Sequence, residues 1–303
     1  MKTCMFFFCM FLFVSCTVQK QLTAARNASA TTKKIVQKES AALDTIQKTL
    51  QGKTENKAVD SVVTVEIQTI LNKLNSRLNS AQQLALLLDA ASVNKATLRR
   101  TMTAATLLKK LIVLDSFNNA RKQREEVYAM LKESVSTAKY RMYHLAAFFD
   151  PGVYRIPSAA IGTIAAQFAP VVDSIAYIAN KYPRIPREAR IVFVGYSDNT
   201  PLMESGALYK ELTGILNNEK PTEQELNQLL SDLRAKEMVR NIKLVVKADA
   251  SKFADFNSLT VGYMGYGRGE EFPSSTITDY KPRDERRRIV LSYWIVLPLA
   301  SAL

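Results

Sequence analysis

The stretch Ile191–Pro201, IVFVGYSDNTP, decides the fold of the second half of this chain. Its first four residues are β-branched or aromatic and predict a buried strand. Gly195 permits a turn at the end of the strand. The short polar residues after it favour a turn or a helix start, because their oxygens accept hydrogen bonds from unpaired backbone N–H groups. Asp198 is therefore expected on a loop at a strand end, where it either caps a turn or helix or takes part in binding.

Residues 1–16, MKTCMFFFCMFLFVSC, resemble a bacterial lipoprotein signal peptide. Lys2 supplies a positive charge, and Met5–Val14 is an apolar run too short to span a bilayer, which takes roughly 20 residues. The resemblance implies that Cys16 becomes the lipidated first residue of the mature chain. An ordinary cleaved signal peptide or a short membrane anchor is the alternative.

The cysteine count agrees with lipidation. The chain contains Cys4, Cys9 and Cys16 and no cysteine after them. A mature chain that begins at Cys16 has no cysteine pair, so its stability must come from a packed core. We expect no later segment to cross a bilayer, and we expect the protein to be lipid-anchored to the outer membrane and to face the periplasm.

Residues 17–150 are predicted to form a helical domain. All ten prolines lie at or after Pro151, and Gly52 is the only glycine before Gly152. Helix interiors disfavour both residue types. Apolar residues at steps of three and four predict helices over 60–91, 95–117 and 119–145, whereas 22–50 is either a weaker helix or a flexible tether. Long apolar stripes joined by short linkers predict antiparallel hairpins or a coiled coil, with partner helices from this chain, from a second copy or from a partner protein.

The positive charge is concentrated in the helical half. Residues 17–150 contain 21 Lys/Arg and 11 Asp/Glu, a net charge of +10, whereas residues 151–303 contain 19 and 17, a net charge of +2. A basic residue near an anionic membrane surface gains roughly 1 kcal/mol before screening. The helical half therefore either contacts lipid headgroups or an acidic partner, or carries solvated lysines. Nucleic acid is not an expected partner, because the chain has an export signal and no recognisable nucleic-acid motif.

Residues 151–303 are predicted to form an α+β domain. A Tyr/Gly-rich segment, VGYMGYGRGEEFP at 261–273, precedes the last strand. The expected elements are a helix over 158–181 that Pro170 bends or divides, the strand from Ile191, a short helix over 204–216, a helix over 222–240, and a final strand over 287–296.

This order of motifs resembles the OmpA-like peptidoglycan-binding domain family over about residues 145–297. GYSDNTP at 195–201 is similar to the family's GHTDNTG, and Leu230–Ala235 is similar to its LSxxRA. Gly265–Gly267, followed by Pro273, is similar to its GYG…P. Arg287–Ile289 stands where the family has the RRV of NRRVEI. The resemblance implies a βαβαββ sandwich over 151–303, whose first strand begins near residue 145.

The resemblance also implies a binding site. In this family, the residues at the positions of Asp198 and Arg234 hold the diaminopimelate side chain of the peptidoglycan stem peptide. A carboxylate can accept hydrogen bonds from the ligand's ammonium group, and a planar guanidinium can bind its carboxylate through two parallel hydrogen bonds. Asn199, Thr200 and Arg287 are secondary candidates for ligand contact.

Several positions depart from the family pattern. Tyr196, Ser197 and Pro201 replace His, Thr and Gly, and proline removes one backbone donor. Two insertions, around 203–217 and 244–257, leave open whether the pocket is accessible. Arg287 and Arg288 have a structural alternative, because they could fix the last strand to the sheet or to the Asp198 loop.

The resemblance implies a non-catalytic lipoprotein that tethers the outer membrane to peptidoglycan. The alternative is a scaffold of an envelope complex whose helical half binds protein partners. An enzyme is not expected: the single histidine, His144, lies at a predicted helix end, and the mature chain has no cysteine nucleophile after Cys16. The adjacent Glu270 and Glu271 are expected to diverge. No metal ligand set and no cofactor is predicted.

Overall fold

The computed structural model describes residues 2–56, 58–138, 141–144, 153–250, 259–273 and 277–299. Its contacts divide the chain into two compact units. One contains 1–47 and 68–128, and the other contains 48–67 and 129–302. Residues 48–67, which connect the first two long helices, are thus grouped with the second unit. The predicted boundary near residue 150 lies outside the described residues.

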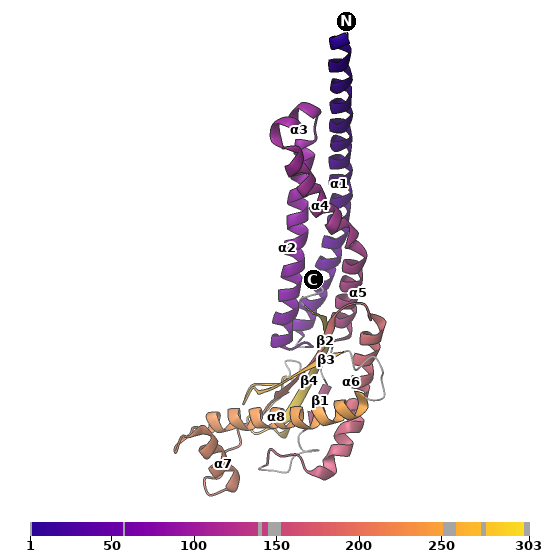
Figure 1. The fold of residues 1–303 in the computed structure, drawn as a ribbon. Helices are drawn as coiled ribbons and strands as arrows, with labels where there is room; N and C mark the ends of the chain where they lie inside the picture. The colour runs from indigo at the N-terminus through magenta and orange to yellow at the C-terminus, as the bar shows by residue number, and fades with distance from the viewer. Residues whose placement is uncertain are drawn as a thin grey trace. The chain divides into compact units, whose positions relative to one another are not determined.

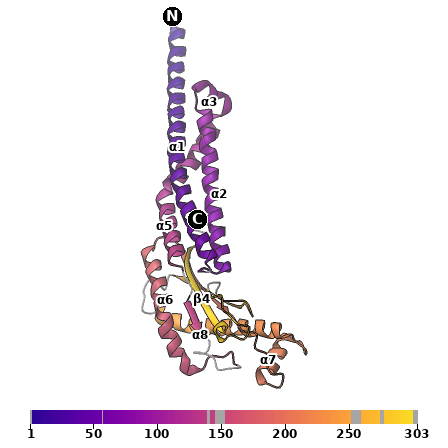
Figure 2. The ribbon, with the colours of Figure 1, turned by 180° about the vertical axis from the view of Figure 1, so that it is seen from behind.

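The first unit is built from long helices. The helices from the first part of the chain are α1 (Lys2–Glu55), α2 (Ser61–Ala91), α3 (Lys95–Thr101), α4 (Ala104–Asn119) and α5 (Arg121–Thr137). Figures 1 and 2 show α1 and α2 side by side, and cross-helix bonds give their direction: Lys33 Nζ to Asp89 Oδ2 at 2.6 Å, and Gln47 Nε2 to Gln68 Oε1 at 2.8 Å. The predicted antiparallel hairpin is confirmed, and 22–50 is helical throughout.

Two predicted helix boundaries are wrong. The helix predicted over 95–117 is interrupted after Thr101, because Thr103 is the N-cap of a new helix and accepts from Thr106 N at 3.2 Å. Such a side-chain cap satisfies an N–H that the helix cannot pair, so it favours a fresh start. The helix predicted over 119–145 ends at Thr137. The residues after it include strand β1 (Arg141–His144), which pairs with the last strand.

A buried ionic cluster joins three helices of the first unit. Glu39 on α1 is 2% exposed and accepts from Arg124 on α5 at 2.8 and 2.9 Å, and from the Tyr128 hydroxyl at 2.9 Å. The Arg124 guanidinium lies 3.8 Å from the centre of the Phe117 ring and donates to the Phe117 carbonyl at 2.6 Å. A buried charge must be paired and hydrogen-bonded. This cluster therefore fixes the register of α1 against the α4–α5 junction.

The second unit contains a mixed sheet flanked by helices. Its elements from residue 141 onward are β1, the short 3-10 helix η2 (Ser158–Ala160), α6 (Ile161–Lys181), β2 (Arg187–Gly195), α7 (Ala207–Leu216), α8 (Glu223–Ala250), β3 (Thr260–Gly267), the 3-10 helix η4 (Glu285–Arg287) and β4 (Ile289–Pro298). The strand order is β1-β4-β2-β3, with β2 parallel to β3 and β4 antiparallel to both β1 and β2. An α+β chain with a helical first half is confirmed.

Helix α6 is a core helix of this unit. It runs as one element through Pro170 and packs against α8 and β4. Among the described residues, the segment 158–181 is long and apolar enough to cross a bilayer by length and composition, which differs from the expectation that none follows the export signal. Its buried side chains are Ile164, Phe168, Val171, Val172, Ile175, Ala176, Ile178 and Ala179.

Helix α8 lies very close to β2 and β3, because glycines line the contact. A Cβ atom at Gly195 or Gly267 would come closer than 3.0 Å to Ser231 on α8. At Gly265 it would come closer than 3.0 Å to the backbone of Ala235. α8 also extends beyond the predicted end at residue 240, so the expected insertion around 244–257 begins as helix; residues 251–257 lie outside the described part. The other expected insertion contains α7.

Gly267→Ala is therefore expected to lower the free energy of unfolding by about 1–3 kcal/mol, because the added methyl group overpacks the contact between β3 and α8. Gly214→Ala is the matched control, because Gly214 lies inside α7 and a Cβ atom added there would have no neighbouring atom within 4 Å. That change is expected to stabilise by about 0.5–1 kcal/mol. Urea unfolding of the two variants measures both effects, and equal changes would contradict the packing described.

Candidate ligand-binding site

The loop that follows β2 is held by backbone hydrogen bonds to three other segments. Tyr196 N donates to the Ile289 carbonyl at 2.9 Å, Ser197 N to the Gly269 carbonyl at 2.8 Å, and Asn199 N to the Pro282 carbonyl at 3.4 Å. The predicted buried strand is confirmed, since Ile191–Val194 are all 3% exposed or less. The loop is thus a fixed platform at the end of the sheet.

Asp198 is buried on this platform and accepts three hydrogen bonds, which leaves one of its roughly four acceptor sites for a further donor. It is 5% exposed, and its two carboxylate oxygens accept from Arg288 Nε and Nη2, each at 3.0 Å. The Thr200 hydroxyl also donates to it, and Arg288 Nη2 donates to Thr200 at 3.3 Å. Burial acts to raise the pKa of the Asp198 carboxyl, but the hydrogen bonds from Arg288 and Thr200 outweigh it and hold the pKa below its ordinary value. Asp198 is therefore ionised at neutral pH.

Arg234 on α8 supplies a second buried cation. It is 6% exposed, and its Nε and Nη2 atoms donate to the Val153 carbonyl at 3.4 and 3.3 Å. Burial and then the charge of Arg288 lower the pKa of Arg234 to about 10, while the charge of Asp198 opposes this shift. The two residues predicted to form the site are thus near enough to interact electrostatically, whereas the residue that bonds directly to Asp198 is Arg288.

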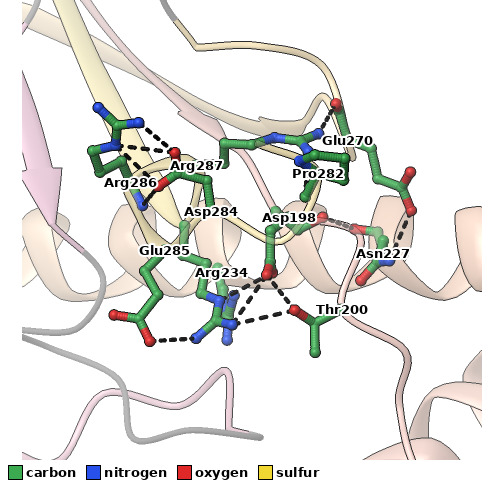
Figure 3. Close-up of polar contacts among 12 residues, drawn as sticks. Asp198, Thr200, Asn227, Arg234, Glu270, Pro282, Asp284, Glu285, Arg286 and Arg287 are labelled. Carbon is green, nitrogen blue, oxygen red and sulfur yellow. Dashed lines mark hydrogen bonds and ion pairs between the residues drawn. The ribbon is translucent and has the colours of Figure 1, made fainter. Parts of the chain in front are cut away.

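Arg287 is used differently from Arg288. It is 3% exposed and donates to the backbone carbonyls of Pro282, at 2.6 Å, and Glu270. Its guanidinium carbon lies 4.7 Å from the centre of the Phe272 ring. Figure 3 shows Arg287 directed toward Glu270 and Pro282. Of its two predicted roles, this geometry matches the structural one, in which it fixes the segment before β4 to neighbouring loops.

The remaining predicted residues have varied surroundings. Thr200 contacts the Asp198 carboxylate, whereas the buried Asn199 Oδ1 has no hydrogen-bond partner among the described residues. Glu270 accepts from Asn227 at 2.8 Å, and Glu271 pairs with Arg268 at 3.2 Å. The side chains of Cys16 and His144 lie outside the described part, although the backbone of His144 belongs to β1.

Arg288 was not predicted as a ligand-binding residue, but its pairing with Asp198 matches its predicted structural role of fixing the last strand to the Asp198 loop. It stands at the end of an Arg286–Arg288 run, and the three side chains diverge: Arg286 pairs with Asp284 at 2.6 Å on the surface. The 3-10 turn at 285–287 directs these three consecutive side chains to different sides of the chain. The only available signal was the run itself, which does not tell which arginine faces which partner.

Chemically, the site holds one carboxylate and two guanidinium groups, a net charge of +1. Carboxylates are bound well by paired guanidinium groups, and ammonium groups by carboxylates. The arrangement is suited to a ligand that carries both groups on neighbouring atoms.

Comparison with known proteins gives little independent guidance. No protein-family model and no curated protein matches this chain. Among solved structures, a crystal structure of a MotB-like protein from Desulfovibrio vulgaris is similar at 16% sequence identity, with a TM-score of 0.29, over 57% of this chain and 95% of that chain. A TM-score of this size does not establish a common fold.

Proposed function

We propose that this chain is a non-catalytic lipoprotein that tethers the outer membrane to peptidoglycan, through lipid on Cys16 and an OmpA-like domain over 151–303. In support, segments far apart in the sequence meet at one end of the sheet. Asp198 of GYSDNTP pairs with Arg288 of the RRRI segment. Ser231 of LSDLRA contacts Gly195, and its hydroxyl accepts from Gly269 N, just after the GYG strand, at 2.9 Å.

The observation that carries the proposal is the buried Asp198 carboxylate near two guanidinium groups. The free end of diaminopimelate has an ammonium and a carboxylate on one carbon. Asp198 would accept from the ammonium, and Arg234 would bind the carboxylate through two parallel hydrogen bonds. The bonds from Arg234 to Val153, at 3.3 and 3.4 Å, are longer than the usual range, and a ligand carboxylate would offer the guanidinium shorter, charge-assisted bonds.

The test is co-sedimentation of the full chain with purified peptidoglycan sacculi. Asp198→Asn removes the negative charge at nearly constant size, and Arg234→Lys keeps the charge but loses the planar fork. Each is expected to weaken binding roughly tenfold or more, since hydrogen bonds to charged groups contribute about 1.5–3 kcal/mol. The double variant Asp198→Ala/Arg234→Ala is expected to sediment at the background level, and free diaminopimelate to compete with wild-type binding.

Lys236→Ala is the matched control, because Lys236 is an exposed cation on α8, two residues after Arg234, in a surface pair with Asp232. It is expected to bind sacculi like the wild type. Circular dichroism establishes that each variant is folded. If folded Asp198→Asn and Arg234→Lys variants co-sediment as well as Lys236→Ala, the proposal is wrong.

A further inference from the structure

Helix α4 in the first unit is apolar on two faces. Its inward face contributes the buried Leu107 and Leu114 to the core of the unit. Its outward face exposes Leu108 by 59%, Ile112 by 58% and Val113 by 57%. Leu108 and Ile112 lie one turn apart on the same side. A helix that is apolar all round is normally covered on all sides, so the outward face calls for a partner outside this unit.

The charge around this face is mainly positive. Residues 90–115 contain five basic residues and one acidic residue, the exposed Asp115, which follows Ile112 by about one turn of α4. Arg99, Arg100 and Lys109 are exposed, whereas Lys95 and Lys110 are partly buried. A partner that covers this region must therefore offer negative charge close to apolar material. Anionic phospholipid headgroups above acyl chains have this combination.

The position of this region in the helical unit also favours a membrane. Arg26 on α1 donates to the carbonyls of Ser92 and Val93, at 2.9 and 2.6 Å, which holds the end of α2 and the start of α3 against α1. Leu98 on α3 lies in one core cluster with Leu22. Figures 1 and 2 show α3 at the end of the helical pair that is nearer the amino terminus. Leu22 is six residues, or about 9 Å of helix rise, from Cys16.

We propose that residues 95–113, hereafter the basic tip, form a second membrane-contact surface that lies on an anionic bilayer. The exposed Leu108 and Ile112 enter the boundary between headgroups and acyl chains, and Arg99, Arg100 and Lys109 contact lipid phosphates. This role is separate from peptidoglycan binding, because it uses the first unit and none of the residues around Asp198. Together with the lipid proposed on Cys16, the basic tip would give two points of attachment at the same end of the helical unit.

The test measures binding of the full chain to vesicles of phosphatidylcholine alone or mixed with phosphatidylglycerol. Arg99→Gln/Arg100→Gln is expected to weaken binding to the mixed vesicles roughly thirtyfold, at about 1 kcal/mol per charge, and to leave binding to neutral vesicles unchanged. Leu108→Ser/Ile112→Ser is expected to weaken binding to the mixed vesicles as well. Lys73→Gln/Arg77→Gln removes two exposed charges in the middle of α2 and serves as the control, which is expected to bind like the wild type.

Hydrogen–deuterium exchange on the same samples locates the contact, because the apolar segment Met5–Val14 can bind either vesicle. Peptides covering 95–113 are expected to gain protection with the mixed vesicles and none with the neutral ones. The proposal is overturned if these peptides gain no protection, or if the tip variants bind mixed vesicles as tightly as the Lys73→Gln/Arg77→Gln control. That result would leave a protein partner as the occupant of the outward face of α4.

Discussion

Asp198→Ala is expected to lower the free energy of unfolding by about 3 kcal/mol, the low end of the range for breaking a buried charge pair, because Asp198 is buried but the Arg288 side chain is 32% exposed. The substitution leaves Arg288 without its bidentate acceptor. It also removes the negative charge that acts on the buried Arg234, so two guanidinium groups that already repel each other lose the anion next to them. Urea unfolding of the purified full chain at neutral pH measures the change.

Asp279→Ala is the control for this prediction. Asp279 also pairs with an arginine, Arg286, at 3.2 Å, but its side chain is 76% exposed. Exposed pairs contribute about 0–1 kcal/mol, so this variant is expected to be nearly as stable as the wild type. Similar losses for the two alanine variants would mean that Asp198 is better solvated than the structure indicates.

The same pair makes stability depend on pH. Because the pKa of Asp198 is lower in the folded chain than in the unfolded chain, its contribution is fully present above the unfolded pKa of about 4. It is lost as pH falls from there through the folded pKa. The stability difference between the wild type and Asp198→Asn is therefore expected to be constant at neutral pH and to shrink below about pH 4. A difference that instead grows on acidification would contradict this assignment.

Arg124→Met is the second substitution with a large expected effect, a loss of about 3–5 kcal/mol in the free energy of unfolding, because it leaves Glu39 charged and buried in the helical unit. Tyr128 alone would then donate to the Glu39 carboxylate. The double variant Glu39→Gln/Arg124→Met removes both charges and keeps an acceptor for Tyr128. It is expected to be more stable than Arg124→Met, and thermal and urea unfolding of both variants measures the difference.

Lys38→Met provides the comparison on the same helix. It breaks the pair between Lys38 and Glu125, 2.8 Å apart, in which the lysine side chain is 65% exposed. The expected change is at most about 1 kcal/mol. If Arg124→Met were no more harmful than Lys38→Met, the register of α1 would have to come from apolar packing alone.

The parts of the fold that could be predicted are those with a periodic local cause. The β-branched residues of Ile191–Val194 and the apolar stripe over 60–91 both correspond to the elements found. The break before Thr103 could not be predicted with confidence from the sequence, because threonine is tolerated inside helices as well as at their caps. The family resemblance implied a first strand near residue 145, and β1 is found at Arg141–His144, inside the range predicted to be helical. Local periodicity gave no sign of this strand, because its partner β4 lies far away in the sequence, as the pairing of Arg141 with Ser292 shows.

The candidate site was predictable only in part for a related reason. Similarity of short motifs indicated Asp198 and Arg234, each on its own element. Which arginine pairs with Asp198 depends on how a 3-10 turn directs three consecutive side chains. The carbonyl that accepts from Arg234 belongs to Val153, 81 residues earlier in the chain. Neither contact has a local sequence signal.

The order β1-β4-β2-β3 means that the strand synthesised last occupies an inner position between two earlier ones. Until β4 is available, β1 and one side of β2 expose unpaired backbone groups, which are templates for pairing with other chains. Formation of the sheet therefore has to wait for nearly the entire polypeptide, and slow, non-local pairing of this kind leaves the growing chain open to aggregation. A chaperone that binds the emerging segment would protect these groups until β4 is in place.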